Sequence, residues 1–162
     1  MPHRGADHFA LPSDPERGAV RFSGPHSEEA RTTGQRQGAV RVLVVEDDFL
    51  IAMQTEVALT AAGFEVVGPA TTAEEAVALA QEAKPLLAVM DIRLASKRDG
   101  IDAARQLYED LAIRCIFATA HDDAHTRGRA EPYAPLGWLP KPYTMASLVT
   151  VVAEALARLR RS

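Results

Sequence analysis

Five short apolar runs, separated by segments of helical period, occupy the chain from residue 40 onward. Each run has the length of a β-strand, and the runs lie at residues 40–45, 64–68, 86–91, 114–119 and 137–140. Strands that alternate with helices favour a parallel sheet covered by helices on both faces. Near-continuous apolar strands are typical of such a sheet, because both of its faces are buried. We therefore predict an α/β fold built on a five-stranded parallel sheet.

The segments between the runs predict helices over residues 49–62, 72–83, 100–110 and 145–161. Asp48 stands where the first helix begins and is its predicted N-cap, and Gly63 is its predicted C′ residue. The first helix carries one apolar stripe made of Leu50, Met53, Val57 and Ala61, and the last carries one made of Met145, Leu148, Val152, Ala155 and Leu159. Prolines interrupt residues 121–135, so any helix there is short.

Residues 1–39 differ in composition from the rest of the chain. Among residues 1–38 only Leu11 and Val20 are branched aliphatics, and this stretch holds four prolines and five glycines. Such a segment buries too little apolar surface to offset its chain entropy. We predict a disordered N-terminal tail over residues 1–39 and one folded domain over residues 40–162. A partner-binding arm and an upstream extension from a misassigned start codon remain alternatives for the tail.

The overall composition excludes several classes of protein. The net charge of −4 argues against a nucleic-acid-binding surface, which is usually basic. The single cysteine, Cys115, rules out an intramolecular disulfide and favours a cytoplasmic location, with its thiol packed as a small apolar group. The N-terminus lacks the apolar core of a secretory signal, and no apolar run approaches the ~20 residues that span a bilayer. We therefore expect neither nucleic acid nor membrane as a partner.

Acidic residues stand at the ends of two predicted strands. Glu46 and Asp47 follow the first run, and Asp91 ends the third. Sites in such folds form beyond the carboxyl ends of the strands, so neighbouring strands would bring these three carboxylates together. That arrangement needs a cation, and a small set of oxygen ligands suits Mg²⁺.

Two further polar residues end the later strands. Thr119 ends the fourth run, and Lys141 follows the fifth. A hydroxyl and an ammonium group beside a metal–carboxylate cluster indicate a bound phosphoryl group. No serine, cysteine or histidine ends a strand in a suitable place, so the predicted nucleophile is a carboxylate.

Four motifs in order and spacing, VLVVEDD, VMDIRL, FATA and LPKPY, resemble the signatures of response-regulator receiver domains of two-component signalling. The resemblance covers residues 41 to about 160 and implies a flavodoxin-like sheet with strand order 2-1-3-4-5. It implies that Asp91 is the phosphoacceptor. It also implies that Mg²⁺ is bound by Glu46, Asp47, Asp91 and the backbone carbonyl of Arg93.

The same resemblance assigns roles to residues around this site. Thr119, Ala120 and Lys141 would contact the phosphoryl group, and the Lys141–Pro142 peptide bond would be cis. Trp138 stands at the position of an aromatic switch residue, together with Thr119, although packing on its strand explains Trp138 equally well. Arg93 and His121 stand where the family tunes the rate of phosphoryl loss.

The function implied is that of a regulatory phosphoacceptor that assists its own phosphorylation and dephosphorylation rather than a conventional enzyme. A sensor histidine kinase would supply the phosphoryl group. The chain ends with the last predicted helix, so we expect a single-domain regulator that signals through a downstream protein or a histidine phosphotransfer protein. A phosphorelay intermediate or a phosphate sink is the alternative within this class. Family members also pair through the fourth helix, fifth strand and fifth helix. The finer likeness is to receivers of stress-response regulators and related stand-alone receivers.

Other classes fit the sequence less well. A haloacid-dehalogenase-like phosphatase needs a second aspartate two residues after its nucleophile, where Arg93 stands. A Rossmann-type nucleotide-binding protein needs a glycine-rich turn in place of the acidic EDDF segment. A zinc site in HDDAH, residues 121–125, lacks the glutamate after the first histidine and a third ligand. A phosphorylation-independent scaffold would not need the five site positions that are all present.

Overall fold

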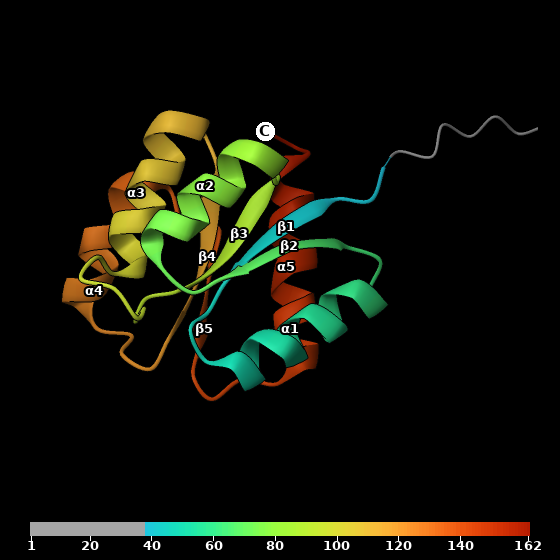
Figure 1. Ribbon diagram of the computed structural model, residues 1–162, viewed down its shortest axis with the longest axis horizontal. Helices are drawn as coiled ribbons and strands as arrows, with labels where there is room; N and C mark the ends of the chain where they lie inside the picture. Colours follow the sequence, from blue (N-terminus) through green and yellow to red (C-terminus); the bar gives the residue numbers. More distant parts are fainter. Residues whose placement is uncertain (1–37) are drawn as a thin grey trace, which may run out of the picture. The chain divides into compact units, whose positions relative to one another are not determined.

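The computed structural model describes residues 38–162, so the predicted tail lies outside the described residues except for its last two positions. Five parallel strands form one sheet in the order β2-β1-β3-β4-β5, which confirms the predicted fold class (Figure 1). The strands are β1 (Arg41–Val45), β2 (Glu65–Ala70), β3 (Leu87–Asp91), β4 (Arg114–Thr119) and β5 (Gly137–Pro140).

Helices cover both faces of the sheet. The helices are α1 (Phe49–Ala61), α2 (Ala73–Ala83), α3 (Gly100–Leu111), α4 (Ala124–Ala130) and α5 (Met145–Leu159), with a 3-10 turn at Glu131–Tyr133. Helices α1 and α5 lie on one face, and α2 and α3 lie on the other, with α4 beside α3 (Figure 1). Within the described part of the chain, none of these helices combines the length and the apolar character needed to cross a bilayer.

Two apolar cores result, one on each side of the sheet. Successive residues of a strand point to opposite faces, so Leu43 and Val45 join the core beneath α2 and α3, whereas Val42 and Val44 join the core beneath α5. Both residue sets are fully buried. This explains why the apolar residues of β1 and β3 follow one another without alternation, apart from one charged residue at an end of each strand.

Local signals in the sequence set several element ends as predicted. The Asp48 side chain accepts hydrogen bonds from the backbone N–H groups of Leu50 and Ile51 and so caps α1. Gly63, the residue after the C-cap Ala62, has a positive φ of 91°. The Lys141–Pro142 bond is cis as expected, and α4 is only seven residues long. Strand β2 continues to Ala70, two residues beyond the predicted end, and contains a second cis bond, Gly68–Pro69, that was not predicted.

The apolar stripe predicted on the first helix is not the side that α1 buries. Leu50 and Val57 are 58% and 65% exposed, and the buried residues are Ala52, Thr55 and Leu59. Apolar residues are spread around most of this helix, so periodicity alone could not select the inner side. The helix approaches the sheet through small side chains and one leucine, which leaves larger apolar groups outside.

Leu59→Ala is expected to lower the free energy of unfolding by about 2–5 kcal/mol, because it removes a fully buried side chain and leaves a cavity. Val57→Ala on the same helix is expected to change it by no more than about 0.5 kcal/mol, since Val57 is mostly exposed. Urea unfolding of the two variants measures both values. Equal destabilisation would contradict the observed orientation of α1.

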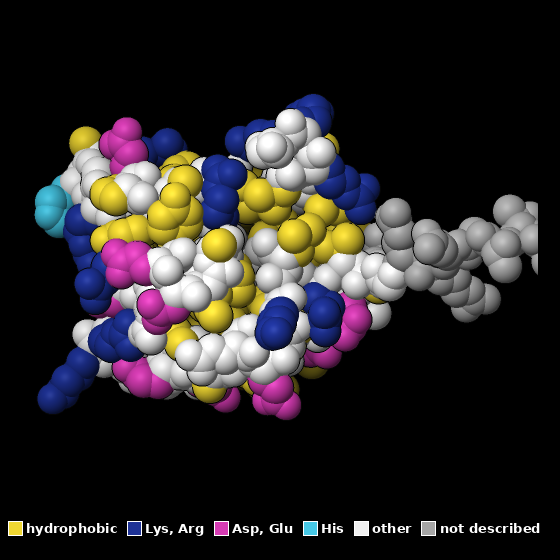
Figure 2. Space-filling view, turned by 90° about the horizontal axis from the view of Figure 1, so that it is seen from above, with side chains coloured by type: hydrophobic (Ala, Val, Ile, Leu, Met, Phe, Trp, Pro, Cys, Tyr) yellow, Lys and Arg dark blue, Asp and Glu magenta, His cyan; other side chains and the backbone are white. Residues whose placement is uncertain are grey.

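The face seen in Figure 2 carries basic and acidic side chains interspersed around apolar ones. It therefore lacks, over the described residues, the continuous basic surface that nucleic acid binds.

Candidate functional site

Three carboxylates meet at the carboxyl edge of the sheet. Strands β1 and β3 are neighbours, with Val45 opposite Met90, so Glu46 and Asp91 follow paired residues. One oxygen of each of Glu46, Asp47 and Asp91 lies within 4.8 Å of the others. The Glu46 and Asp91 residues are only 5% and 6% exposed, whereas Asp47 is exposed. The three carboxylates therefore converge as predicted, and exposed Asp47 leaves one side of the group open to solvent.

Backbone groups fix one oxygen of each buried carboxylate. The Asp48 N–H donates to Glu46 Oε1 at 3.0 Å, and the Arg93 N–H donates to Asp91 Oδ1 at 3.2 Å. The other oxygens, Glu46 Oε2 and Asp91 Oδ2, each lie 3.2 Å from the ammonium of Lys141. One lysine therefore bridges two acids that come from different strands.

The lysine does not fully balance these acids. Burial and the charge of Asp91 raise the pKa of Glu46 to about 7, although the Asp48 N–H and Lys141 oppose the rise. Burial lowers the pKa of Lys141, but its attraction to Asp91 and Glu46 outweighs burial and raises that pKa above the usual value. Lys141 therefore stays charged, while burial and the neighbouring Asp91 disfavour the charged form of Glu46. A second positive charge at this edge of the sheet would therefore be electrostatically favourable.

The donor set fits a hard divalent cation. All three side chains offer carboxylate oxygens, their spacing allows a shared ion, and exposed Asp47 leaves the site open to water. Mg²⁺ keeps several waters and takes few protein oxygens, so Glu46, Asp47 and Asp91 are suitable ligands. The backbone carbonyl of Arg93 stays a predicted ligand.

Thr119 ends β4 beside the carboxylates, and its hydroxyl is hydrogen-bonded to the loop that follows β4. The hydroxyl accepts from the His121 N–H at 3.0 Å and donates to the His121 carbonyl at 3.2 Å. The backbone of β5 follows closely, since the Lys141 N–H donates to the Thr119 carbonyl at 2.8 Å. Ala120 lines a groove together with Lys141. Its contact with a phosphoryl group stays a prediction.

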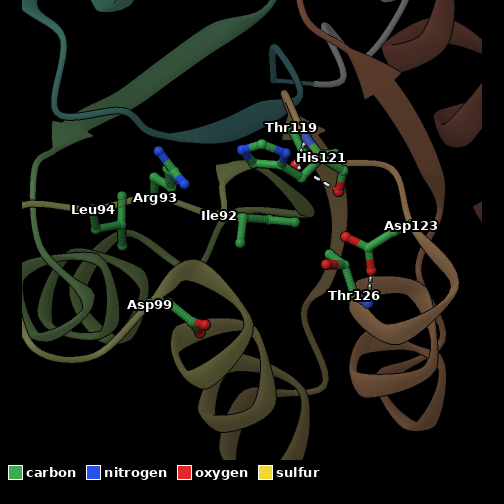
Figure 3. A pocket seen from close by; sticks show the side chains of 8 residues that line it. All are labelled: Ile92, Arg93, Leu94, Asp99, Thr119, His121, Asp123 and Thr126. Carbon is green, nitrogen blue, oxygen red and sulfur yellow. Dashed lines mark hydrogen bonds between the residues drawn. The ribbon is translucent and has the colours of Figure 1, made fainter.

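Arg93 and His121 share one cavity next to the carboxylates. The cavity has a volume of about 480 Å³, and Figure 3 shows its lining, which consists of Ile92, Arg93, Leu94, Asp99, Thr119, His121, Asp123 and Thr126. Arg93 and His121, the two predicted rate-tuning residues, therefore line the same cavity as Thr119. Their effect on phosphoryl loss stays a prediction.

The HDDAH segment has structural roles. The Asp122 carboxylate pairs with Arg127, and the Asp123 side chain caps α4 by accepting from the Thr126 N–H. In the part of the chain that the structure describes, the one group of potential metal ligands found is Glu46, Asp47 and Asp91.

Two residues that support the site were not identified from the sequence. A Cβ atom on Gly100 would lie 2.0 Å from the Asp91 carbonyl oxygen, so this position has no room for a side chain. Asp99 caps α3 and forms a capping box with Asp102, and it is held by Arg129 at 2.7 Å. The available signal was the Asp-x-x-Asp spacing around a glycine, a weak helix former placed at the start of a helix.

Comparisons with known proteins agree on one family. The family model of the response regulator receiver domain matches residues 42–153. The transcriptional regulatory protein PdtaR of Mycobacterium tuberculosis is 35% identical over 120 residues, which cover 74% of this chain and 58% of that protein. The phyllosphere-induced regulator PhyR of Methylorubrum extorquens is 36% identical over 119 residues, which cover 73% of this chain and 44% of that protein.

A solved structure matches over nearly its whole length. The signal receiver domain of a modulated diguanylate cyclase from Desulfovibrio desulfuricans G20 has a TM-score of 0.68 and 32% identity, covering 74% of this chain and 95% of that one. The chain spans only about half the length of the two curated relatives. The similarity therefore concerns one domain of those proteins.

Proposed function

We propose that this chain, which belongs to the response regulator receiver domain family, accepts a phosphoryl group on Asp91 from a sensor histidine kinase in a Mg²⁺-dependent reaction. One observation carries the proposal. The Lys141 ammonium lies 3.2 Å from a free oxygen of Asp91 and of Glu46, within a group of three carboxylates spaced to share an ion.

Each residue of the site would have a different role in the phosphoryl transfer. The Arg93 N–H fixes Asp91 Oδ1, so Oδ2, the oxygen that faces Lys141, is the better placed nucleophile. Oδ2 forms the new bond to phosphorus while the bond from phosphorus to the kinase histidine nitrogen breaks, and that nitrogen keeps the electron pair. Lys141 then pairs with a phosphoryl oxygen. A divalent cation on the three carboxylates would neutralise further charge on the phosphoryl group.

Thr119 would take part through its hydroxyl. At present that hydroxyl is hydrogen-bonded within its own loop, to the backbone of His121. We propose that it exchanges a loop contact for a phosphoryl oxygen when Asp91 is modified. The loop after β4 would then change position with it.

We propose a regulatory rather than an enzymatic role, because the phosphoryl group stays on the protein's own side chain. We propose that the signal leaves through the surface of this domain to a partner protein. The reaction would take place in the cytoplasm, where the kinase presents its phosphorylated histidine.

The proposal is tested by incubating the full chain with Mg²⁺ and a small phosphodonor, and by reading the intact mass. A single phosphoryl adduct that disappears when the metal is chelated supports the proposal. The purified phosphorylated kinase domain serves as a second donor. Absence of an adduct with both donors, in samples that contain Mg²⁺, would rule out the proposed phosphoacceptor.

Lys141→Met is expected to bind Mg²⁺ more tightly than the unmodified chain but to form the adduct about 10²-fold more slowly. Methionine is unbranched and keeps all but the terminal atom of the side-chain length, and it removes the ammonium that competes with a cation for Glu46 and Asp91. Calorimetric titration gives the metal affinity, and the mass assay gives the rate. An unchanged rate would show that Lys141 does not stabilise the transferring group.

A further inference from the structure

Arg129 of α4 reaches the first turn of a different helix, α3. Its Nη1 group lies 2.7 Å from Asp99 Oδ2, and its Nη2 group lies 4.0 Å from Asp102 Oδ1. These two carboxylates form the capping box of α3. Figure 3 shows Asp99 at the start of α3 and Thr126 of α4 lining the same cavity. One guanidinium group of α4 therefore faces both acids that begin α3.

Each acid of the capping box uses one oxygen for the cap and presents the other to Arg129. Asp99 Oδ1 accepts from the N–H groups of Ile101 and Asp102, both at 3.0 Å. Asp102 Oδ2 accepts from the Asp99 N–H at 3.1 Å. The remaining oxygens are the ones that face the guanidinium group. The ion pair is therefore separable from the cap, because a substitution can remove the first and leave the second.

The charges in this turn favour the contact. Burial raises the pKa of Asp99, but the hydrogen bonds from Arg129 and from backbone N–H groups outweigh burial and lower that pKa below its usual value. Two carboxylates in one helical turn repel each other, and a guanidinium charge between them offsets that repulsion. In the described part of the chain, the ion pairs that join α4 to α3 are those of Arg129.

The first turn of α3 lies directly against the backbone of the phosphoacceptor. The Gly100 N–H donates to the Ile92 carbonyl at 2.8 Å, and the Asp91 carbonyl oxygen fills the space that a Cβ on Gly100 would take. The Arg93 N–H, two residues after Asp91, fixes the Oδ1 oxygen of its carboxylate. Packed backbone of this kind transmits displacement, so a shift of this turn would also shift the segment that aims the carboxylate.

We infer that Arg129 is a positioning residue for phosphoryl transfer, which holds the first turn of α3 against the backbone of Asp91 through the acids of the capping box. The inference rests on the proposed function, because the orientation of Asp91 matters only if it accepts the phosphoryl group. Arg129 does not touch the reacting atoms and acts through Asp99. A merely structural ion pair makes a different prediction, since its loss would lower stability and leave the rate of the folded protein unchanged.

Arg129→Gln is expected to slow formation of the phosphoryl adduct roughly two- to fivefold, the range that loss of a partly exposed ion pair allows. The Arg129 and Asp99 side chains are 39% and 31% exposed. The full chain is incubated with Mg²⁺ and acetyl phosphate, and initial rates are read from the intact mass. Arg129→Lys should recover part of the rate, because an ammonium group can still pair with Asp99 Oδ2. An unchanged rate in Arg129→Gln would overturn the inference.

Asp99→Asn separates the ion pair from the cap. Asparagine caps helices as well as aspartate does, and its amide oxygen can still accept from Ile101 and Asp102. The amide nitrogen that replaces Oδ2 is a donor and cannot pair with Arg129. This variant should also slow the adduct, and the double variant should be no slower than Arg129→Gln alone, because both changes remove one contact. Additive losses would show that Arg129 does not act through Asp99.

Arg105→Gln is the matched control for the loss of charge. Arg105 is an exposed arginine on α3 itself, and the ion pairs of the described residues do not include it. Its adduct should form at the rate of the unmodified chain. Equal slowing in Arg105→Gln and Arg129→Gln would assign the effect to net charge and would overturn the positioning role.

Amide hydrogen exchange separates this inference from the proposed phosphorylation. Exchange of the Gly100 amide, which donates to the Ile92 carbonyl, reports on the first turn of α3 without any phosphodonor. NMR should show this amide exchanging about two- to fivefold faster in Arg129→Gln than in Arg105→Gln. Equal exchange would overturn the positioning role. An adduct absent from every sample, the unmodified chain included, would refute the proposed function, while the exchange of Gly100 would still decide whether Arg129 holds this turn.

Discussion

Asp91→Asn is expected to abolish the phosphoryl adduct completely. Asparagine nearly preserves the shape of the side chain and can still accept the Arg93 N–H through its amide oxygen. It replaces Oδ2, the oxygen 3.2 Å from Lys141, with an amide nitrogen that does not attack phosphorus. The variant should remain folded, because removal of one charge relieves the repulsion that contributes to the raised pKa of Glu46. Intact mass spectrometry after incubation with Mg²⁺ and a phosphodonor measures the effect.

Asp110→Asn provides the matched control for this change. Asp110 is an exposed aspartate on α3, outside the three-carboxylate group. The control should form the adduct at the rate of the unmodified chain. An adduct that persists in Asp91→Asn would place the phosphoryl group on another residue and would contradict the assignment of Asp91.

Gly100→Ala is expected to have the largest structural effect on the site. The added Cβ would lie 2.0 Å from the Asp91 carbonyl oxygen and 2.9 Å from the Asp91 carbonyl carbon and the Ile92 Cα. These are backbone atoms, so no side chain can rotate to relieve the overlap. The loss of stability should reach or exceed the about 1–3 kcal/mol that is usual for overpacking. Because the displaced backbone carries the phosphoacceptor, the adduct should be lost or strongly slowed as well.

Gly128→Ala tests whether this effect is specific to the position. A Cβ on Gly128, in α4, would have no heavy atom within 4 Å. Alanine there should be neutral or should stabilise by about 0.5–1 kcal/mol, as it does within helices generally. Urea unfolding and the mass assay on the two alanine variants give the comparison. Equal behaviour would show that the close approach of α3 to Asp91 does not shape the site.

The sequence determined the fold class and most of the site. Apolar runs in alternation with helical segments permit few arrangements other than a parallel sheet, and the carboxyl ends of its strands share one edge. For that reason the positions of Glu46, Asp47, Asp91 and Lys141 in the sequence are enough to place them at one edge of the sheet. Helix caps such as Asp48 could also be predicted from the sequence, because a cap depends on contacts within a few residues.

Other features required the tertiary structure, because they depend on contacts between segments far apart in the chain. The buried side of α1 follows from its packing, since its apolar residues surround most of the helix and several remain exposed. Position 100 needs glycine because the backbone carbonyl of Asp91, nine residues earlier in the chain, occupies the space that a Cβ atom would fill. The cover that Arg127 forms over Trp138 joins α4 to β5. Periodicity and motif spacing report local geometry and chain order, whereas steric exclusion and side-chain contacts across elements exist only once the elements are packed.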